Sequence, residues 1–251
     1  MIIIAGYGFV GRAYYELLDT EYTVEIVDPQ YNDNRIYDFP YAAGLVCCVG
    51  TPTSENGNYD TSQLHSVISQ TAPHIPILIK STITIDIWDE LKRKYPNHSL
   101  TFSPEFLRAA SATEDVFNAR FAIVSGDDAA FWCRILQDAH ISIDTYVSEP
   151  EEAIAAKQFI NAYLATKVSF FNQLFDYCEA NDIDYSSVKQ LMLLDSRIGN
   201  SHTVVTEKRG WGGYCFPKDS SALLAAAKDA GISLSVLNAA CKYNNKIRKS
   251  S

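Results

Sequence analysis

Cys215 is the residue in this sequence best suited to covalent chemistry, because it lies in a run, Gly210–Asp219, that combines paired glycines with a Lys-Asp pair. The glycines leave backbone that can approach a ligand closely, and Pro217 suits the first turn of a helix. Unpaired N–H groups and the dipole at a helix N-terminus stabilise a thiolate, and Lys218 adds positive charge. The run therefore favours a nucleophilic cysteine just before a helix. The alternative is a glycine-rich turn with a structural cysteine, since buried free cysteines are common and inert.

A second segment, Gly6–Gly11, has the GxGxxG spacing of a nucleotide-binding turn and lies between an apolar run and helical sequence. The first glycine makes the tight turn, the second lets a pyrophosphate approach the helix N-terminus, and the third lets helix and strand pack. A second strand ends at Asp28, whose carboxylate would bind the adenosine ribose and repel a 2′-phosphate. The sequence therefore predicts a site for NAD rather than NADP. The alternative is an ordinary turn between a strand and a helix.

The third candidate is the pair Lys157 and Asn161, which lies in a helix expected over residues 149–180. The two side chains are four residues apart and extend the apolar stripe of this helix, so they share its inward face. A lysine on an inward face is unfavourable unless it has a partner, which makes the pair a site candidate. The alternative is a lysine that reaches along the helix to solvent beside a surface asparagine.

The elements that must position these residues divide the chain into two parts. Up to residue 148, apolar strands alternate with helices, which predicts an α/β, Rossmann-like, doubly wound parallel sheet; after it the pattern is helical. We therefore expect an NAD-binding domain over residues 1–148 and a helical domain over residues 149–251. The connection from Asp28 to Leu45 is short and polar, so this crossover is expected to be trimmed. Strands are expected at 2–5, 23–27, 44–50, 76–80, 100–102, 120–125 and 141–147, and helices at 60–71, 86–95, 127–139, 149–180 and 234–248.

Composition narrows the class of protein. The chain has 251 residues and a net charge of -9, which argues against general nucleic-acid binding. No apolar run reaches the roughly 18 residues of a membrane span, and the N-terminus lacks the basic region of a signal peptide, so we expect a soluble cytoplasmic protein. The cysteines show neither CxxC nor Cys/His ligand spacing, which predicts no disulfide framework and no metal site.

Together these segments resemble the UDP-glucose/GDP-mannose dehydrogenase family. The resemblance implies a four-electron oxidation of a nucleotide sugar, with UDP-glucose converted to UDP-glucuronate for polysaccharide biosynthesis and two NAD reduced. A thiolate would capture the aldehyde as a thiohemiacetal, and loss of a second hydride would give a thioester that water hydrolyses. The matching motifs run in order along nearly the whole chain: Gly6–Gly11, Val49–Thr53, Lys80–Thr82, Ser103–Arg108, Lys157–Asn161, Asp195–Gly199 and Gly210–Asp219.

The resemblance also assigns roles to individual residues. It implies that Cys215 is the nucleophile and that Lys157, with Asn161, stabilises the developing oxyanion. The groups that would orient water or move protons are Asp219, Thr82 and Glu105, and which of them is the base stays open. Cofactor contacts are implied for Gly6, Tyr7, Gly8, Phe9, Val10, Gly11, Asp28, Thr51, Pro52, Thr53 and Thr82. Substrate contacts are implied for Phe106, Leu107, Gly212, Gly213, Lys218 and Arg197, the last of which would reach the site of a neighbouring subunit.

The sequence departs from the family pattern in three places. The family usually has a third, Rossmann-like domain that holds the nucleotide, and we expect this chain to lack it, which leaves open how the nucleotide is bound and whether it is UDP or GDP. Ala109 stands where the family commonly has a second glutamate, four residues after Glu105. The loop over 199–210 is slightly longer than is common, so His202 and Lys208 are candidates for a replaced substrate contact.

Two other functions fit part of the pattern. A β-hydroxyacid dehydrogenase has a similar Lys/Asn arrangement, but its two-electron chemistry needs no thiol, so Cys215 argues against it. An inactive NAD-binding or assembly module would fit a chain that lacks the third domain. Because the long helix has more apolar surface than one small domain can cover, we also expect a homodimer built through it.

Overall fold

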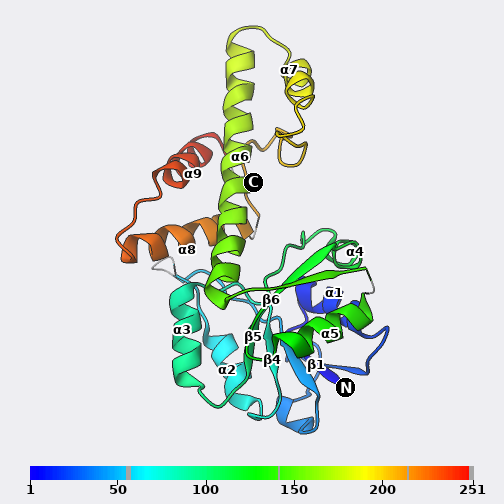
Figure 1. Ribbon diagram of the computed structural model, residues 1–251. Helices are drawn as coiled ribbons and strands as arrows, with labels where there is room; N and C mark the ends of the chain where they lie inside the picture. The colour runs from blue at the N-terminus through cyan, green and yellow to red at the C-terminus, as the bar shows by residue number, and fades with distance from the viewer. Residues whose placement is uncertain (55–57, 141, 214, 249–251) are drawn as a thin grey trace. The chain divides into compact units, whose positions relative to one another are not determined.

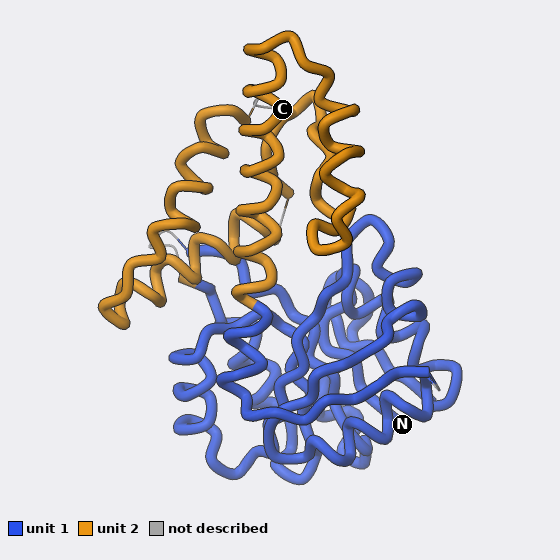
Figure 2. The backbone as a smooth tube through the Cα atoms, turned by 45° about the horizontal axis from the view of Figure 1, so that its top comes forward, with its two compact units in different colours: residues 1–54, 59–157 blue, residues 55–58, 158–251 orange. Residues whose placement is uncertain are grey.

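The computed structural model describes residues 1–54, 58–140, 142–213 and 215–248. They form two compact units (Figure 2): unit 1 comprises Met1–Ser54 and Tyr59–Lys157, and unit 2 comprises the described residues of Gln158–Ser251 and of Glu55–Asn58. The division between the units falls inside one long helix. The boundary at residue 148, where the NAD-binding domain is expected to end, stays a prediction.

Unit 1 is built on a sheet of short, buried strands. Within the described residues they are β1 (Ile2–Ala5), β2 (Val24–Val27), β3 (Gly44–Cys47), β4 (Ile77–Ile79), β5 (Leu100–Phe102), β6 (Phe121–Gly126) and β7 (Asp144–Val147). Their order in the sheet is β2-β1-β3-β4-β5-β6-β7, and all neighbours are parallel except β5 and β6. Apolar runs such as β1 form central strands because helices bury both of their faces. The sheet confirms the expected Rossmann-like fold.

Helices cover both faces of this sheet (Figure 1). They are α1 (Phe9–Leu18), α2 (Ser62–Gln70), α3 (Ile85–Lys94), α4 (Ala112–Phe117) and α5 (Ala129–Ala139). Helices α1, α4 and α5 share one core with alternate strand residues such as Ile2, Ile4 and Val46. The intervening residues, such as Ile3 and Leu45, are buried on the other face, where α2 and α3 lie.

Some elements differ from the expectation, including α2 and α5, which each begin two residues later than expected. Helix α4 was not predicted, because its six residues are too few to show helical periodicity. Strand β3 ends at Cys47 rather than at residue 50, since the chain leaves the ladder there and enters a loop. Strand β7 begins at Asp144, and residue 141, where this strand was expected to start, lies outside the described residues.

The connection from β2 to β3 is trimmed, as its short polar sequence predicts. Residues 28–43, all of which the structure describes, contain no α-helix and only one 3₁₀ turn, η1 (Ile36–Asp38). The side-chain amides of Asn32 and Asn34 donate to the carbonyl oxygen of Ile26 at 2.8 and 3.0 Å and fold this loop back onto the end of β2. Strands β2 and β3 lie on either side of β1, and residues 28–43 join them without a crossover helix.

Unit 2 is helical. Its helices are α6 (Pro150–Ala180), which begins in unit 1, α7 (Tyr185–Met192), α8 (Cys215–Asp229) and α9 (Ser235–Ile247). Helices α6 and α9 agree with the prediction to within one residue at each end. Ala162, Leu223 and Leu237 join α6, α8 and α9 in one small core. In the described part of the chain, no helix is both long enough and apolar enough to cross a membrane.

Candidate active site

The carboxyl ends of four parallel strands form one edge of unit 1. The chain order of the strands reverses at β1, because β2 lies on one side of it and β3 on the other. Ligands of open α/β sheets bind at the carboxyl end of such a reversal. The loops after β1, β3, β4 and β5 therefore begin side by side at the expected place for a ligand. The last residues of these strands are register partners: Ala5, Cys47, Ile79 and Phe102.

The glycine-rich turn leads from β1 into α1. Gly6 has φ +89°, and a Cβ there would lie 2.9 Å from the backbone of Cys48. A Cβ on Gly11 would lie 2.0 Å from the carbonyl oxygen of Gly6. At Gly8, the N-cap of α1, a Cβ would have no described atom within 4 Å other than those of Gly8 and its chain neighbours, which leaves space in front of a helix N-terminus. This arrangement fits a pyrophosphate, which would accept hydrogen bonds from the helix N–H groups.

Asp28 follows β2 and touches this turn. Its Oδ2 accepts a hydrogen bond from the N–H of Tyr7 at 2.7 Å, and its Oδ1 accepts one from the N–H of Gln30 at 2.8 Å. The ring of Tyr31 lies against that of Tyr7, with centroids 4.4 Å apart. The carboxylate is therefore fixed beside the turn, where it can accept hydrogen bonds from a ribose. The other two residues of the turn, Phe9 and Val10, are half-buried against the core of unit 1.

Thr51 and Thr82 connect the loops after β3 and β4. The buried hydroxyl of Thr51 donates to the carbonyl oxygen of Thr82 at 2.8 Å, and Ser81 Oγ donates to the carbonyl oxygen of Val49 at 2.7 Å. Thr82 itself is half-buried, whereas Pro52 and Thr53 are exposed. The two loops therefore form one surface next to the glycine-rich turn.

Lys80, the first residue after β4, is buried beneath this edge. Its Nζ donates to Ser103 Oγ at 2.9 Å, forms an ion pair with Glu105, and lies 4.4 Å from the centroid of the Tyr14 ring. Burial lowers the pKa of Lys80 to about 7; the Cys48 thiol opposes this effect, and the charge of Lys157 adds to it. Sequence reasoning used Lys80 only as part of a motif and gave it no role, although a lysine directly after a buried strand was an available signal.

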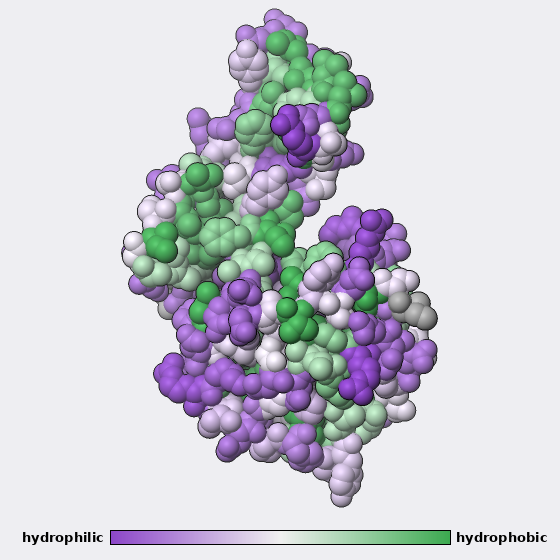
Figure 3. All heavy atoms as spheres, viewed as in Figure 1, coloured by the Kyte–Doolittle hydropathy of each residue, from purple (hydrophilic) through white to green (hydrophobic). Residues whose placement is uncertain are grey.

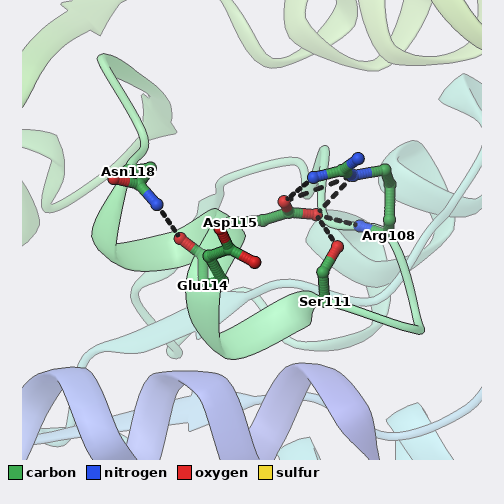
Figure 4. A network of polar contacts seen from close by, with 5 residues as sticks. All are labelled: Arg108, Ser111, Glu114, Asp115 and Asn118. Carbon is green, nitrogen blue, oxygen red and sulfur yellow. Dashed lines mark hydrogen bonds and ion pairs between the residues drawn. The ribbon is translucent and has the colours of Figure 1, made fainter.

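The segment after β5 is fixed to the start of α4 (Figure 4). The backbone N–H of Arg108 donates to the Asp115 carboxylate at 2.8 Å, and the guanidinium forms an ion pair with the same carboxylate. Ser111 Oγ adds a hydrogen bond to Asp115 at 3.2 Å. Hydrogen bonds from Arg108 lower the pKa of Asp115 to about 2. These contacts hold the backbone that carries Phe106 and Leu107, the expected substrate contacts.

Lys157 lies on α6 and is buried, as a functional lysine on an inward helix face should be. Its Nζ is 5.2 Å from the centroid of the Phe106 ring, which places it within reach of a cation–π interaction. The Phe106 ring also packs on Phe121, with centroids 5.5 Å apart. In unit 1, therefore, Lys157 joins the segment that carries Glu105.

A second buried polar cluster lies in unit 2. Asn161 Nδ2 donates to Asp219 Oδ2 at 2.6 Å, and Lys218 Nζ forms an ion pair with Asp219 Oδ1 at 2.8 Å. All three residues are buried. Cys215 is the first residue of α8 rather than the residue before the helix, so it lies one helical turn from Asp219 on the same face. The cysteine is half-buried and lies at the N-terminus of a helix, as the sequence predicted to within one residue.

The loop before Cys215 is held by buried side-chain amides. Asn172 Oδ1 accepts from the N–H of Gly210 at 3.0 Å. Asn244 Oδ1 accepts from the N–H of Trp211 at 2.7 Å, and its Nδ2 donates to the carbonyl oxygen of Trp211 at 3.0 Å. Gly213 has φ +79°, and a Cβ on Gly212 would lie 2.6 Å from the Arg248 guanidinium. Sequence reasoning missed both asparagines, which lie on α6 and α9 without a motif around them.

Two further candidate residues lie in the loop region between α7 and α8, and their predicted contacts with substrate stay predictions. Arg197 forms an ion pair with Asp195 at 2.5 Å, and its side chain is 86% exposed, so the structure links it to its own loop. His202 lies near Phe216, with ring centroids 5.7 Å apart. Among the described residues, no group of three or more His, Cys, Asp or Glu side chains could hold a metal ion.

Comparison with known protein families gives two matches. Residues 38–137 match the NAD binding domain of the UDP-glucose/GDP-mannose dehydrogenase family, and residues 151–246 match the central domain of the same family. UDP-glucose 6-dehydrogenase TuaD of Bacillus subtilis is 32% identical over 217 residues, which are 81% of this chain and 46% of that protein. The chain spans about half the length of the curated relatives that it matches.

Solved structures show the same fold. A UDP-glucose dehydrogenase from the hyperthermophilic archaeon Pyrobaculum islandicum superposes with a TM-score of 0.87 at 21% identity, covering 98% of this chain and 68% of that one. The 3-hydroxyisobutyrate dehydrogenase of Mycobacterium tuberculosis gives a TM-score of 0.76 at 16% identity, covering 98% of this chain and 92% of that one. At these identities the likeness concerns the fold alone.

Proposed function

We propose that this chain, which belongs to the UDP-glucose/GDP-mannose dehydrogenase family, contributes the cofactor site and the nucleophile of an NAD-dependent enzyme that oxidises UDP-glucose to UDP-glucuronate. The main support is Cys215 at the N-terminus of α8, one helical turn from the Asp219 carboxylate that Asn161 holds. Oxidation of an alcohol to an acid needs a group that retains the aldehyde, whereas a two-electron oxidation does not. Two NAD molecules, bound one after the other, would supply the oxidation, the first by accepting a hydride from the alcohol and the second by accepting one from the thiol adduct.

Unit 1 would hold the cofactor. The open N-terminus of α1 at Gly8 suits the pyrophosphate, and Asp28 would accept hydrogen bonds from the ribose hydroxyls. Asp28 would also repel a 2′-phosphate, which favours NAD over NADP. Thr51 and Thr82, which connect the neighbouring loops, would line the same crevice together with Thr53.

Cys215 would hold the aldehyde. The Cys215 thiolate would attack the aldehyde carbon, so that an S–C bond forms and the carbonyl oxygen becomes an oxyanion. Lys157 would stabilise that oxyanion by its charge, and Asn161 by the Nδ2 hydrogen that Asp219 does not take. Loss of a hydride and collapse of the oxyanion would then leave a thioester on the sulfur.

Hydrolysis of the thioester would release the acid. Water adds to the thioester carbon, the S–C bond breaks, and Cys215 leaves as a thiolate. Asp219, which Asn161 and Lys218 hold through its two oxygens, would orient that water. Thr82 and Glu105 at the edge of unit 1 are the other candidates for taking its proton. Phe106, Leu107 and the paired glycines before Cys215 would contact the sugar nucleotide.

A homodimer is the proposed assembly. On α6, Phe159, Tyr163 and Phe170 are 51–63% exposed, an unusual position for three aromatic rings on one helix. Hydrophobic surface is visible over α6 and α7 in the space-filling view (Figure 3). A second copy that packs on α6 would cover these rings, as expected from the long apolar helix. Sedimentation equilibrium tests this assembly: a monomer at all concentrations would contradict it.

The proposed reaction is tested by its stoichiometry. The protein is incubated with NAD and UDP-glucose, and the NADH formed is divided by the sugar consumed. Two NADH per sugar is the expected result. One NADH per molecule of a small hydroxy acid would indicate a β-hydroxyacid dehydrogenase. Measurable NAD binding without turnover of any nucleotide sugar would indicate a binding or assembly module.

A further inference from the structure

Lys80 is a buried charged group that the proposed mechanism does not use. Only 4% of the residue is exposed. Its backbone N–H donates to the carbonyl oxygen of Cys47 at 2.9 Å, as the strand ladder requires. This main-chain hydrogen bond does not itself require a lysine at this position. Because burial of a lysine is unfavourable, a lysine at this position is expected to have a role beyond the main-chain hydrogen bonds of the sheet.

The groups around the Lys80 side chain come from several elements of unit 1. Tyr14 of α1 presents its ring, Cys48 presents a thiol from the loop after β3, and Lys157 presents a second positive charge from α6. The loop after β5 supplies Ser103 Oγ at 2.9 Å and the carboxylate of Glu105. Glu105 is thus the negative charge in contact with Lys80, and it is the sole carboxylate in the segment 103–109.

The Glu105 segment is held on both sides. Lys80 binds Ser103 and Glu105 at its start, while Arg108 is bound to Asp115 at its end. Phe106, between these two points, packs on Phe121. A carboxylate held in this way can keep one orientation and one charge state, which is what a proton acceptor in hydrolysis requires.

We propose that Lys80 positions Glu105: as its ion-pair partner, Lys80 holds the Glu105 side chain in one orientation at the carboxyl edge of the sheet. This inference rests on the proposed function for the use to which Glu105 is put, but the pairing itself can be measured without turnover. Lys80 acts through Glu105 and is therefore a positioning residue rather than a catalytic one.

The primary test follows the protonation of Glu105 by NMR of protein labelled with ¹³C at the glutamate carboxyls, with the Glu105 signal assigned from Glu105→Gln. In Lys80→Met, the titration midpoint of Glu105 is expected to rise by about 1–3 pH units, because an opposite charge is removed from a half-buried carboxylate. Lys80→Arg keeps the positive charge, so its Glu105 titration midpoint is expected to stay close to that of the wild type. Equal midpoints in wild type and Lys80→Met would overturn the proposal.

A matched control is Lys92→Met. Lys92 is likewise paired with a carboxylate, that of Asp127 at 2.5 Å, but it lies on the surface of α3. This variant is expected to leave the Glu105 midpoint unchanged, and an equal shift would show a general charge effect. If Lys80→Met does not fold, the reciprocal experiment decides. By linkage, Glu105→Gln must lower the midpoint of the Lys80 ammonium, followed through its ¹³Cε signal. An unchanged midpoint there would also overturn the proposal.

The activity measurement separates this inference from the proposed function. In Lys80→Met, the acidic limb of the pH profile for UDP-glucuronate formation is expected to move to higher pH, with kcat reduced more than KM is raised. If the wild type forms no uronate although Glu105 responds to Lys80 in the titration, the pairing stands and the proposed function fails. If uronate forms but Glu105 titrates independently of Lys80, the proposed function stands and the pairing fails.

Discussion

The glycine-rich turn of unit 1 and the loop before Cys215 in unit 2 both bend the backbone sharply, but they are held by different groups. In unit 1, main chain packs directly on main chain, so that a Cβ on Gly11 would meet the carbonyl oxygen of Gly6 at 2.0 Å. In unit 2, side-chain amides hold the loop, and Asn244 takes both the N–H and the carbonyl of Trp211. The first turn depends on the absence of side chains, whereas the second depends on particular side chains.

This difference matches what each unit is proposed to hold. A pyrophosphate is bound by backbone N–H groups at a helix N-terminus, so the turn must leave room for it. A nucleophile must be kept in place while its bonds change, and buried hydrogen bonds to Asn172 and Asn244 fix the loop that leads to it. The two halves should therefore fail in response to different substitutions.

The largest effect is expected from Asn244→Leu. This change leaves the N–H and the carbonyl of Trp211 buried without their partner, which should lower the free energy of unfolding by about 2–5 kcal/mol. Urea denaturation measures the loss, and the rate of Cys215 alkylation reports the effect on the loop. The exposed neighbour Asn245→Leu is the control and should change stability by less than about 0.5 kcal/mol. Similar losses in both variants would refute the role of the buried amide.

A smaller loss of stability is expected from Gly11→Ala, where the new methyl group would meet the backbone of Gly6. Forcing a methyl group into packed space lowers stability by about 1–3 kcal/mol. Gly8→Ala is the matched control, because its Cβ enters open space and its φ of −70° suits alanine. We expect Gly8→Ala to leave stability within about 0.5 kcal/mol of the wild type while titration calorimetry shows weaker NAD binding. Unchanged NAD affinity in Gly8→Ala would argue against a pyrophosphate at this turn.

The smallest effect is expected where a side chain holds a loop at the surface, as Asp115 holds Arg108 in unit 1. Asp115→Asn should lower stability at pH 7 by about 1 kcal/mol, since solvent screens the exposed guanidinium. The folded pKa of Asp115 is lowered from 3.8 to about 2, chiefly by hydrogen bonds from Arg108, so its contribution is present above pH 3.8 and is lost as pH falls toward 2. The difference from wild type in urea denaturation should therefore shrink over that range. A constant difference at all pH values would exclude this cause.

The same comparison explains what could be predicted from the sequence. The turn at Gly6 and Gly11 was predictable, because close backbone contacts demand glycine at fixed spacing before a helix. The trimmed crossover and the long helix α6 follow from chain length and apolar periodicity. The sequence around Cys215 placed it at the start of a helix to within one position, while its role as a nucleophile stays a prediction.

The groups that hold the loops were not predictable in the same way. Asn172 and Asn244 lie far apart in sequence on two helices, and nothing in the pattern distinguishes buried Asn244 from exposed Asn245. Their function depends on tertiary contacts alone. Lys80 was visible within a motif, but its pairing with Glu105 depends on the register of β4 and β5, which the sequence does not state.

The most direct test of the central claim is the product formed by Cys215→Ala with NAD and UDP-glucose. The control is Cys133→Ala. Cys133 is half-buried like Cys215 but lies in unit 1, so this variant should behave as the wild type. We expect the wild type and the control to give two NADH per sugar together with UDP-glucuronate. Cys215→Ala should form no UDP-glucuronate and at most one NADH per sugar, because no thioester can form. Undiminished UDP-glucuronate from Cys215→Ala would contradict the account.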